Sequence, residues 1–413
     1  MPSLDQLVGS QKRTSDIRSR PFRHRYLNSS VVGPSVSNGP IRFTLPKQNA
    51  GYLDISSLRF RGRLTVTGAD GVTATTDAGA RLAGHDASIL FDRIRVMSGS
   101  NLVYDQEYNP LISNYMNGLL DPTESDYKNY ERALADYPQD AARTSQVTTA
   151  HASKRIVIGK LGPAGSFLNQ GALIPLEMLS SPMHIELYFT KPEVAFKSTD
   201  AGLTYKFENF ELNWDALYSG SLDAHYQNNV VSHHVTQYAH RYNPIKPGTS
   251  QVNLGIPSNS SNVSGIITFI RNQADNVSTM ANEKLESCNF PATSIKSVNF
   301  SIATKSIYDQ PLGPDVCEYE DQWRHLFPAL SCSRHYTPTG IEDNQFVLAT
   351  NLSGAPKQFH ADLVSGVQTA NLNTDMQLEL QFTAPTASEL QCDHYVMSDV
   401  VYTFRNGRLD KQE

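Results

Sequence analysis

The chain has 413 residues, a formal net charge of −6 at pH 7, 39% hydrophobic residues and 18% charged residues. This length is more than one ordinary core needs, and two domains of about 190 residues are the natural division. No run approaches the ~18 apolar residues of a membrane-spanning helix. The first residues, Met-Pro-Ser-Leu-Asp-Gln, contain no apolar signal core, so we do not expect export through a secretory signal.

The first 34 residues are expected to form a basic N-terminal arm. Residues 1–30 show no periodic apolar pattern, and one acid, Asp16, stands among the basic residues of 11–25. Those basic residues are Lys12, Arg13, Arg18, Arg20, Arg23 and Arg25. Such an arm suits contact with phosphates of nucleic acid or of lipid headgroups. A solvated tail, or one that binds a neighbouring protein, is the alternative.

The first half of the chain alternates short apolar–polar runs with turn residues, which is typical of strands. Strands are expected around 41–45, 60–66, 94–96, 102–104, 156–158, 183–189 and 207–214. Leu111, Tyr115, Met116 and Leu119 have helical spacing and predict a helix over 108–120. Residues 68–86 and 121–154 are expected to be long inserted loops.

The second half repeats this arrangement. Strands are expected around 266–270, 298–302, 376–382 and 400–404, with a helix over 318–326. Residues 219–232 are expected to be a linker in which Ser221 caps a turn of helix. Residues 406–413 are expected to be a short charged tail.

Two sequence echoes indicate a duplication. Met183–Pro192 and Met376–Pro385 share six of ten residues, and both alternate apolar and polar positions until a proline ends the strand. Val103-Tyr104-Asp105-Gln106 precedes the first copy, and Ile307-Tyr308-Asp309-Gln310 precedes the second. Two echoes in the same order, at a spacing far longer than that of solenoid repeats, indicate two similar domains.

The expected fold is all-β, with two tandem eight-stranded jelly rolls, short helices and long inserted loops. The expected divisions are an arm (1–34), a first roll (35–218), a linker (219–232), a second roll (233–405) and a tail (406–413).

Several local segments resemble the double jelly-roll major capsid proteins of adenoviruses, tailless phages with internal membranes, virophages and polinton-like or adintovirus-like elements. The segments are 39–46, 52–54, 58–64, 89–96, 99–101 and 108–109. The resemblance covers roughly residues 35–405. It implies a structural protein of the virion, three copies of which form a pseudo-hexagonal, hexon-like capsomer. Such capsomers tile an icosahedral shell around double-stranded DNA, often over a membrane.

The resemblance also implies partners. The chain would bind itself, first as a homotrimer and then as neighbouring capsomers, and it would contact penton or minor capsid proteins. In the family the arm commonly lies on the inner side of the shell. The six basic residues of 11–25 would there contact genome DNA, an internal membrane or a neighbouring subunit.

No motif for catalysis, a cofactor or a metal is evident, so no enzymatic activity is expected. His233 and His234 are adjacent, and on a strand they would point to opposite faces. Glu186 and Glu379 are matched by the duplication and would lie on wet strand faces. Asp105 and Asp309 precede the helices and would satisfy free backbone N–H groups there.

Other residues are expected to have structural roles. Trp214 and Trp323 would lie in the core. Cys288, Cys317, Cys332 and Cys392 form no Cys-x-x-Cys pair and would be reduced thiols.

Two alternatives remain open. A tandem β-sandwich that binds carbohydrate or a receptor, as in a minor vertex protein or an adhesin, would need clustered aromatic and acidic residues in loops. An enzyme on a cupin-like or glycoside-processing scaffold would need a histidine-rich metal triad or a close carboxylate pair.

Overall fold

The computed structural model describes thirteen stretches of the chain: residues 17–34, 39–71, 81–83, 87–120, 155–197, 202–260, 262–273, 292–303, 305–313, 316–326, 347–353, 366–369 and 376–412. The expected loop 121–154 lies outside these residues, as does most of the loop 68–86. Among the described residues, no helix is long and apolar enough to cross a membrane.

The chain divides into two compact units. The first comprises Met1–Asn114, Thr123–Val235 and Val400–Gln412, and the second comprises Tyr115–Pro122, Thr236–Asp399 and Glu413. The last residues, Val400–Gln412, therefore belong with the first unit and not with the segment that directly precedes them.

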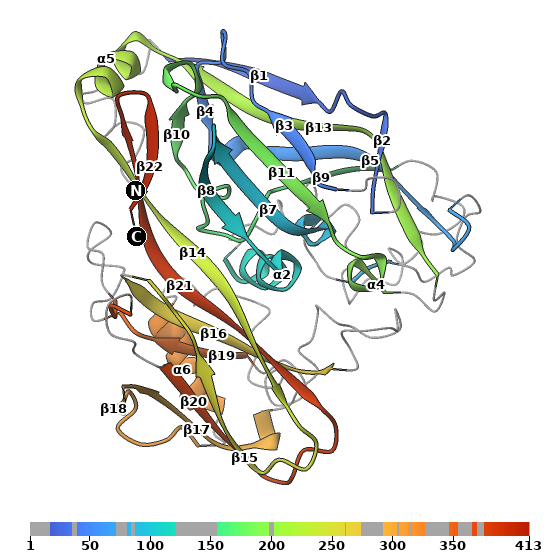
Figure 1. Cartoon of the computed structure of the whole chain (residues 1–413), viewed down its shortest axis with the longest axis vertical. Helices are drawn as coiled ribbons and strands as arrows, with labels where there is room; N and C mark the ends of the chain where they lie inside the picture. Colours follow the sequence, from blue (N-terminus) through green and yellow to red (C-terminus); the bar gives the residue numbers. More distant parts are fainter. Residues whose placement is uncertain are drawn as a thin grey trace. The chain divides into compact units, whose positions relative to one another are not determined.

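The first unit contains two large antiparallel sheets (Figure 1). The β13 sheet has the order β10-β4-β13-β5-β9, with β1 and β2 also paired to β13. Its strands are β1 (Arg18–Arg25), β2 (Val31–Val32), β4 (Tyr52–Asp54), β5 (Arg59–Thr67), β9 (Arg155–Gly159), β10 (Leu173–Pro175) and β13 (Thr204–Tyr218).

The β11 sheet has the order β3-β11-β7-β8. Its strands are β3 (Ile41–Thr44), β7 (Phe91–Ser98), β8 (Asn101–Gln106) and β11 (Met183–Phe189). A small third sheet pairs β6 (Arg81–Leu82) with β12 (Phe196–Lys197).

An aromatic core joins the two large sheets of the first unit. Phe60 of β5 meets Phe91 of β7 edge to face at 4.8 Å between ring centroids, and Phe43 of β3 lies 5.7 Å from Phe210 of β13. These rings are buried because the strands alternate: in β5, Phe60, Leu64 and Val66 are buried while the arginines between them are partly exposed. Face-to-face burial of this kind makes the first unit a sandwich.

The helices of the first unit are short. They are η2 (Ile55–Ser57), η3 (Ala87–Leu90), α2 (Asn109–Leu120), η5 (Leu176–Met178), α4 (Pro192–Ala195) and α5 (Gly220–Asn228). The helix predicted over 108–120 is confirmed by α2, although the last residues of this helix fall to the second unit.

The segment expected to be a linker forms α5, which packs onto the first unit. Ser219, not Ser221, is the capping residue, and its side chain accepts a hydrogen bond from the Ser221 backbone N–H. Tyr226 is buried and donates a 2.7 Å hydrogen bond from its hydroxyl to the carbonyl of Leu173. The apolar contacts of Tyr226 hold α5 against the first unit.

The second unit also has two antiparallel sheets. One has the order β14-β21-β16-β19, and the other has the order β15-β20-β17-β18. Their strands are β14 (Val231–Ile245), β15 (Gln251–Ile256), β16 (Val263–Asn272), β17 (Ile295–Ile302), β18 (Lys305–Ser306), β19 (Val347–Asn351), β20 (Met376–Phe382) and β21 (Leu390–Arg405). The short helix η7 (Ala292–Ser294) precedes β17, and α6 (Val316–Leu326) confirms the helix expected over 318–326.

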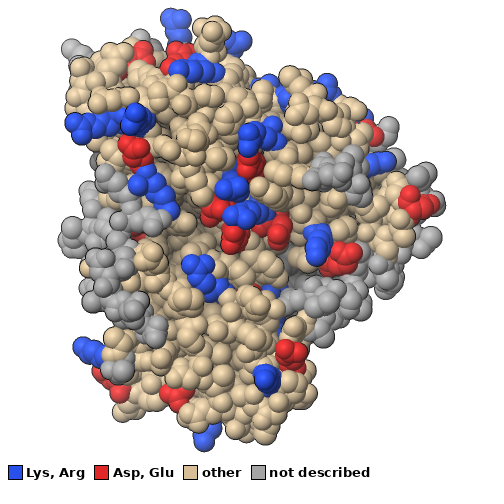
Figure 2. All heavy atoms as spheres, viewed as in Figure 1, with Lys and Arg blue, Asp and Glu red and all other residues tan. Residues whose placement is uncertain are grey.

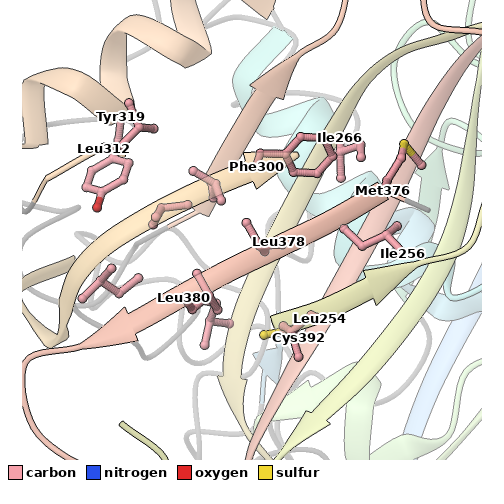
Figure 3. Packing of buried hydrophobic residues seen from close by; sticks show 14 of the residues in the cluster. Leu254, Ile256, Ile266, Phe300, Leu312, Tyr319, Met376, Leu378, Leu380 and Cys392 are labelled. Carbon is pink, nitrogen blue, oxygen red and sulfur yellow. The ribbon is translucent and has the colours of Figure 1, made fainter. Parts of the chain in front are cut away.

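The core of the second unit is mainly aliphatic. Leu378 and Leu380 of β20 lie among buried residues that include Leu254 of β15 and Phe300 of β17 (Figure 3). Trp323 of α6 is buried and donates a 2.7 Å hydrogen bond from its indole nitrogen to the carbonyl of Val347. Trp214 is likewise buried in the first unit. The prediction that both tryptophans lie in the core is therefore confirmed.

The two echoed strands occupy equivalent places. β11 pairs with β3 and β7, and β20 pairs with β15 and β17, so each copy lies between two antiparallel neighbours (Figure 1). Met376–Phe382 alternates buried and partly exposed residues without exception. Each strand ends before its proline, as predicted.

Two segments expected to be tails are strands. Arg18–Arg25 forms β1, whose residues pair with β13 from Tyr218 to Glu211. At the other end, Arg408–Gln412 forms β22, which pairs with the last part of β21. Asn406 and Gly407 make the turn between them with φ of 51° and 75°, the conformation that Asn-Gly hairpin turns favour.

Candidate functional site

The outer face of the β11 sheet carries a connected group of charges. Figure 2 shows acidic and basic side chains gathered over this sheet, which faces the viewer. Arg42 donates from Nε to Oε1 of Glu186 at 2.8 Å, and Nη1 of Arg95 lies 3.6 Å from Oε2 of the same carboxylate. Glu186 is thus bound from both neighbouring strands.

The group continues along β7 and β8. Nε of Arg93 donates to Oδ1 of Asp105 at 2.8 Å, and its Nη2 lies 2.8 Å from Oε1 of Glu107. The hydrogen bond to Asp105 is the largest cause that raises the pKa of Arg93 above its ordinary value. These ion pairs join side chains of β3, β7, β8 and β11, so the arrangement holds neighbouring strands together.

Two sequence predictions need correction at this site. Glu186 was expected on a wet face, but its side chain is 4% exposed because the two arginines cover it. Asp105 was expected to cap a helix, but it lies within β8 and pairs with Arg93 and Arg95. Asp309 is exposed in a bend, and α6 begins only at Val316, so it does not cap that helix either.

The basic residues predicted as a contact site are only partly described. Lys12 and Arg13 lie outside the described residues. Arg18, Arg20, Arg23 and Arg25 are exposed on β1. On this strand, Phe22 stacks on Trp214 at 5.5 Å with nearly parallel rings, and Tyr26 beyond its end lies 5.5 Å from Phe43. These rings anchor β1 to the first unit.

The arginines of β1 fall on two faces of the strand. Arg20 lies over the ring of Phe22 at 5.3 Å. Arg25 donates a hydrogen bond to the side-chain oxygen of Asn209. Arg23 lines a cleft of about 190 Å³ together with Arg61, Gly62, Arg63, Asn209 and Glu211. The strand therefore places part of the predicted site beside β5 arginines that were not predicted to belong to it.

The first unit also has a larger cleft, of about 300 Å³. Its lining includes Arg18, Tyr52, Glu177, Tyr218 and Asp223. The Tyr52 hydroxyl donates to Oδ1 of Asp223 at 2.7 Å. Burial, and then this hydrogen bond, raises the pKa of Tyr52 above its ordinary value. The cleft thus combines aromatic rings with carboxylates.

The second unit contains a buried charge cluster around Asp393. Arg271 donates from Nε to Oδ2 of Asp393 at 2.9 Å, and Nε2 of His240 lies 2.9 Å from Oδ1. Burial alone would raise the pKa of Asp393, but the charge of Arg271 and the His240 contact outweigh it and lower this pKa to about 2. The neighbouring His394 is also buried, and burial lowers its pKa to about 4.

Neither charge cluster forms a metal centre. Within the described parts of the chain, no group of three or more His, Cys, Asp or Glu side chains has the arrangement of a metal site. His233 lies 3.4 Å from the Tyr226 hydroxyl, and burial lowers its pKa. Cys392 is a buried free thiol, while Cys288 and Cys332 lie outside the described residues.

No protein-family model and no curated protein matches the sequence. Solved structures do match over nearly the whole chain. VP54 of PBCV-1, fitted into a reconstruction of the virophage Sputnik, has a TM-score of 0.65 at 9% identity and covers 98% of both chains.

Two further capsid proteins give the same result. The Faustovirus major capsid protein has a TM-score of 0.56 at 9% identity, covering 94% of this chain and 90% of that one. The mavirus major capsid protein has a TM-score of 0.53 at 11% identity, covering 97% and 90%. The fold is the double jelly roll of viral major capsid proteins. The expected fold class is confirmed, and at these identities the likeness concerns the fold.

Proposed function

We propose that this protein is a viral major capsid protein that builds homotrimeric, pseudo-hexagonal capsomers in an icosahedral shell around double-stranded DNA. The observation that carries the proposal is the likeness to the three capsid structures, which extends through both jelly rolls at TM-scores above 0.5. A structural match to a protein with one jelly roll would cover only about half of the chain.

The double roll suits a hexagonal lattice. Three chains with two similar sandwiches each present six similar domains around a threefold axis, and closed symmetric oligomers are the usual form of self-association. Strands with both faces packed or ion-paired, such as β11, make each sandwich a rigid unit. Lateral contacts between such units depend on polar side faces and loops.

The proposed partners follow from this role. The chain binds two further copies of itself, then neighbouring capsomers and penton or minor capsid proteins, and it is located in the virion. The arm residues Lys12, Arg13, Arg18, Arg20, Arg23 and Arg25 contact DNA, an internal membrane or a neighbouring subunit on the inner side. The protein has no catalytic role in this proposal.

Electron microscopy of the purified protein tests the proposal. Negatively stained particles are expected to have a hexagonal outline with threefold symmetry, and conditions that favour assembly are expected to give closed shells. Particles of two lobes without threefold symmetry, at every concentration tried, would contradict it.

The 300 Å³ cleft favours one second candidate, a tandem β-sandwich that binds carbohydrate or a receptor. Tyr218 offers a ring, while Glu177 and Asp223 offer hydrogen-bond acceptors, a combination that suits a sugar. Saturable binding on a glycan array, lost in Tyr218→Ala, would support this candidate. An array without binding would remove it.

A further inference from the structure

Three neighbouring strands of the first unit carry a band of arginines on the face opposite the aromatic core. β13 lies between β1 and β5 at this point. Arg23 of β1 and Arg59 of β5 both pair with Asn213 of β13, and Arg25 and Arg61 both pair with Glu211. Because residues paired across strands point to the same side of a sheet, these arginines flank β13 in two columns.

The band is strongly basic in a chain that is acidic as a whole. The outward residues are Arg23, Arg25, Arg59, Arg61, Arg63 and Lys206, against Glu208, Glu211 and Asp215. Six basic and three acidic side chains leave a local charge of +3, whereas the chain carries −6. Local charge of this sign attracts polyanions and concentrates them at the surface.

A cleft lies within the band. Arg23, Arg61 and Arg63 line it with Asn209 and Glu211, and its volume is about 190 Å³. Arg61 lies 3.3 Å from Glu211, which neutralises one of the three arginines. Among the described residues, neither Arg23 nor Arg63 has an ion-pair partner. Two guanidinium groups at one cleft are thus available for an external anion.

A bulge shapes this cleft. The register between β13 and β5 shifts between Glu208 and Glu211, and Asn209 in the bulge has a φ of 52°. The extra residue brings the Asn209 side chain to the rim, where it accepts a hydrogen bond from Arg25. β-bulges commonly redirect side chains next to functional sites.

We propose that this arginine band binds the phosphodiester backbone of nucleic acid, with Arg23, Arg61 and Arg63 contacting a phosphate in the cleft. Guanidinium groups recognise phosphate oxygens through paired N–H donors. Along one strand, outward side chains recur about every 6.7 Å, so the two columns offer repeated positive charge to a chain of repeated negative charge. A single free anion would use only one cleft.

The surroundings of the band favour nucleic acid over a lipid surface. The exposed large hydrophobic residues described in the first unit, Leu27, Leu102 and Val230, come from separate elements. Leu27 alone follows β1, and one leucine gives little apolar area for insertion among lipids. Binding through phosphates would be independent of base sequence and strongly dependent on salt.

The inference deepens the proposed function, since it rests on a capsid protein that encloses nucleic acid, but its measurement does not require assembly. The full-length protein is titrated into a fluorescein-labelled DNA duplex, and into one strand of it, at about 50 mM salt. The variant Arg23→Gln/Arg63→Gln removes the two cleft arginines that have no ion-pair partner. The matched control, Arg405→Gln/Arg408→Gln, removes the same charge from exposed residues of the C-terminal hairpin.

The cleft variant is expected to bind DNA at least 10-fold more weakly, and its salt slope should fall by about 2. The hairpin control is expected to stay within 2-fold of the unmodified protein. Glu211→Gln is expected to tighten binding several-fold, because it removes the carboxylate from the cleft. Equal melting temperatures among the variants would exclude unfolding as the cause.

Three results of the binding experiments themselves would overturn the inference, and a fourth comes from competition. They are no DNA binding by the unmodified protein at low salt, equal losses in the cleft variant and the hairpin control, or binding to vesicles of equal parts phosphatidylserine and phosphatidylcholine without binding to DNA. Inorganic phosphate at millimolar concentration is included as a competitor, and full displacement by it would show a free-anion site instead. Trimers that bind no DNA would reject this inference alone, whereas a DNA-binding monomer would reject the proposed capsomer.

Discussion

Glu186 of the first jelly roll and Glu379 of the second occupy the same register position and have different neighbours. Glu186 pairs across the sheet with Arg42 and Arg95, and Glu379 pairs with Asn253 and Asn299. The duplication thus kept the carboxylate while one roll surrounds it with arginines and the other with asparagines. In the second roll, Gln251 donates to Glu379 at 2.6 Å.

This difference predicts unequal effects of the same substitution. Glu186→Gln should lower the free energy of unfolding by about 1–2 kcal/mol, because it leaves Arg42 and Arg95 beside a neutral group. Arg42 is exposed to water, so the loss should stay below that of a fully buried ion pair. Glu379→Gln should cost under about 0.5 kcal/mol, because its neighbours are neutral and partly exposed. Urea unfolding measures both, and equal losses would contradict the account.

The C-terminal hairpin should contribute to the stability of the first roll. Tyr402 of β21 is buried and donates a 2.8 Å hydrogen bond to the carbonyl of Val103 in β8. Tyr402→Phe should cost about 1–2 kcal/mol, since it leaves that carbonyl without its donor.

Removal of residues 406–413 tests the same hairpin more severely. We expect the melting temperature to fall by several degrees, because the deletion exposes the apolar end of β21. A truncated chain with the same melting temperature as the full-length protein would mean that these residues are a free tail.

Stability should decrease as the pH falls below neutrality, partly through His394. This side chain is buried, and its Nδ1 shares a 2.8 Å hydrogen bond with Oγ1 of Thr268. Burial lowers its pKa to about 4. The unfolded chain binds a proton near pH 6.5 while the folded chain does not, so stability is lost as pH falls from about 6.5 to about 4, by up to about 1.4 kcal/mol per pH unit.

His394→Gln should flatten this part of the pH profile. The free energy of unfolding, measured at pH 7, 6, 5 and 4.5, gives the slope of stability against pH for each protein. Asp393, whose pKa is lowered to about 2, contributes only at lower pH, and His240 remains in both proteins. Identical slopes for the variant and the unmodified protein would show that His394 is not the group that titrates.

Neutralising the basic arm should affect assembly rather than folding. With Lys12, Arg13, Arg18, Arg20, Arg23 and Arg25 all changed to Gln, we expect the trimer to persist, because β1 is anchored by Phe22 and Tyr26 on the first roll. Particle yield, or the nucleic acid within particles, should fall. Unchanged particle yield and unchanged nucleic-acid content would count against a role of the arm in assembly or in packaging.

The sequence alone predicted the elements whose pattern is local. Met376–Phe382 alternates perfectly, so its buried face followed from the spacing of four apolar residues. The burial of Glu186 did not follow from local spacing. It depends on Arg42 and Arg95, which lie 144 and 91 positions away and meet Glu186 only through strand pairing.

Two of the strands that the sequence did not predict, β1 and β22, were missed for different reasons. β1 has Phe22 and His24 on one side, with Tyr26 just beyond its end, and the arginines of this segment obscured its alternation. β22 follows an Asn406-Gly407 pair, which is a strong hairpin signal in itself, so its turn was available in the sequence. The arginine band required the structure, although Arg59, Arg61 and Arg63 alternate visibly in β5.

The mass of the purified protein in solution tests the central claim most directly. Light scattering behind a sizing column should give about 137 kDa, which is three chains of 45.7 kDa, and this mass should persist on dilution. That result would support the trimeric capsomer. A stable species of one chain, with no larger form at high concentration, would contradict it.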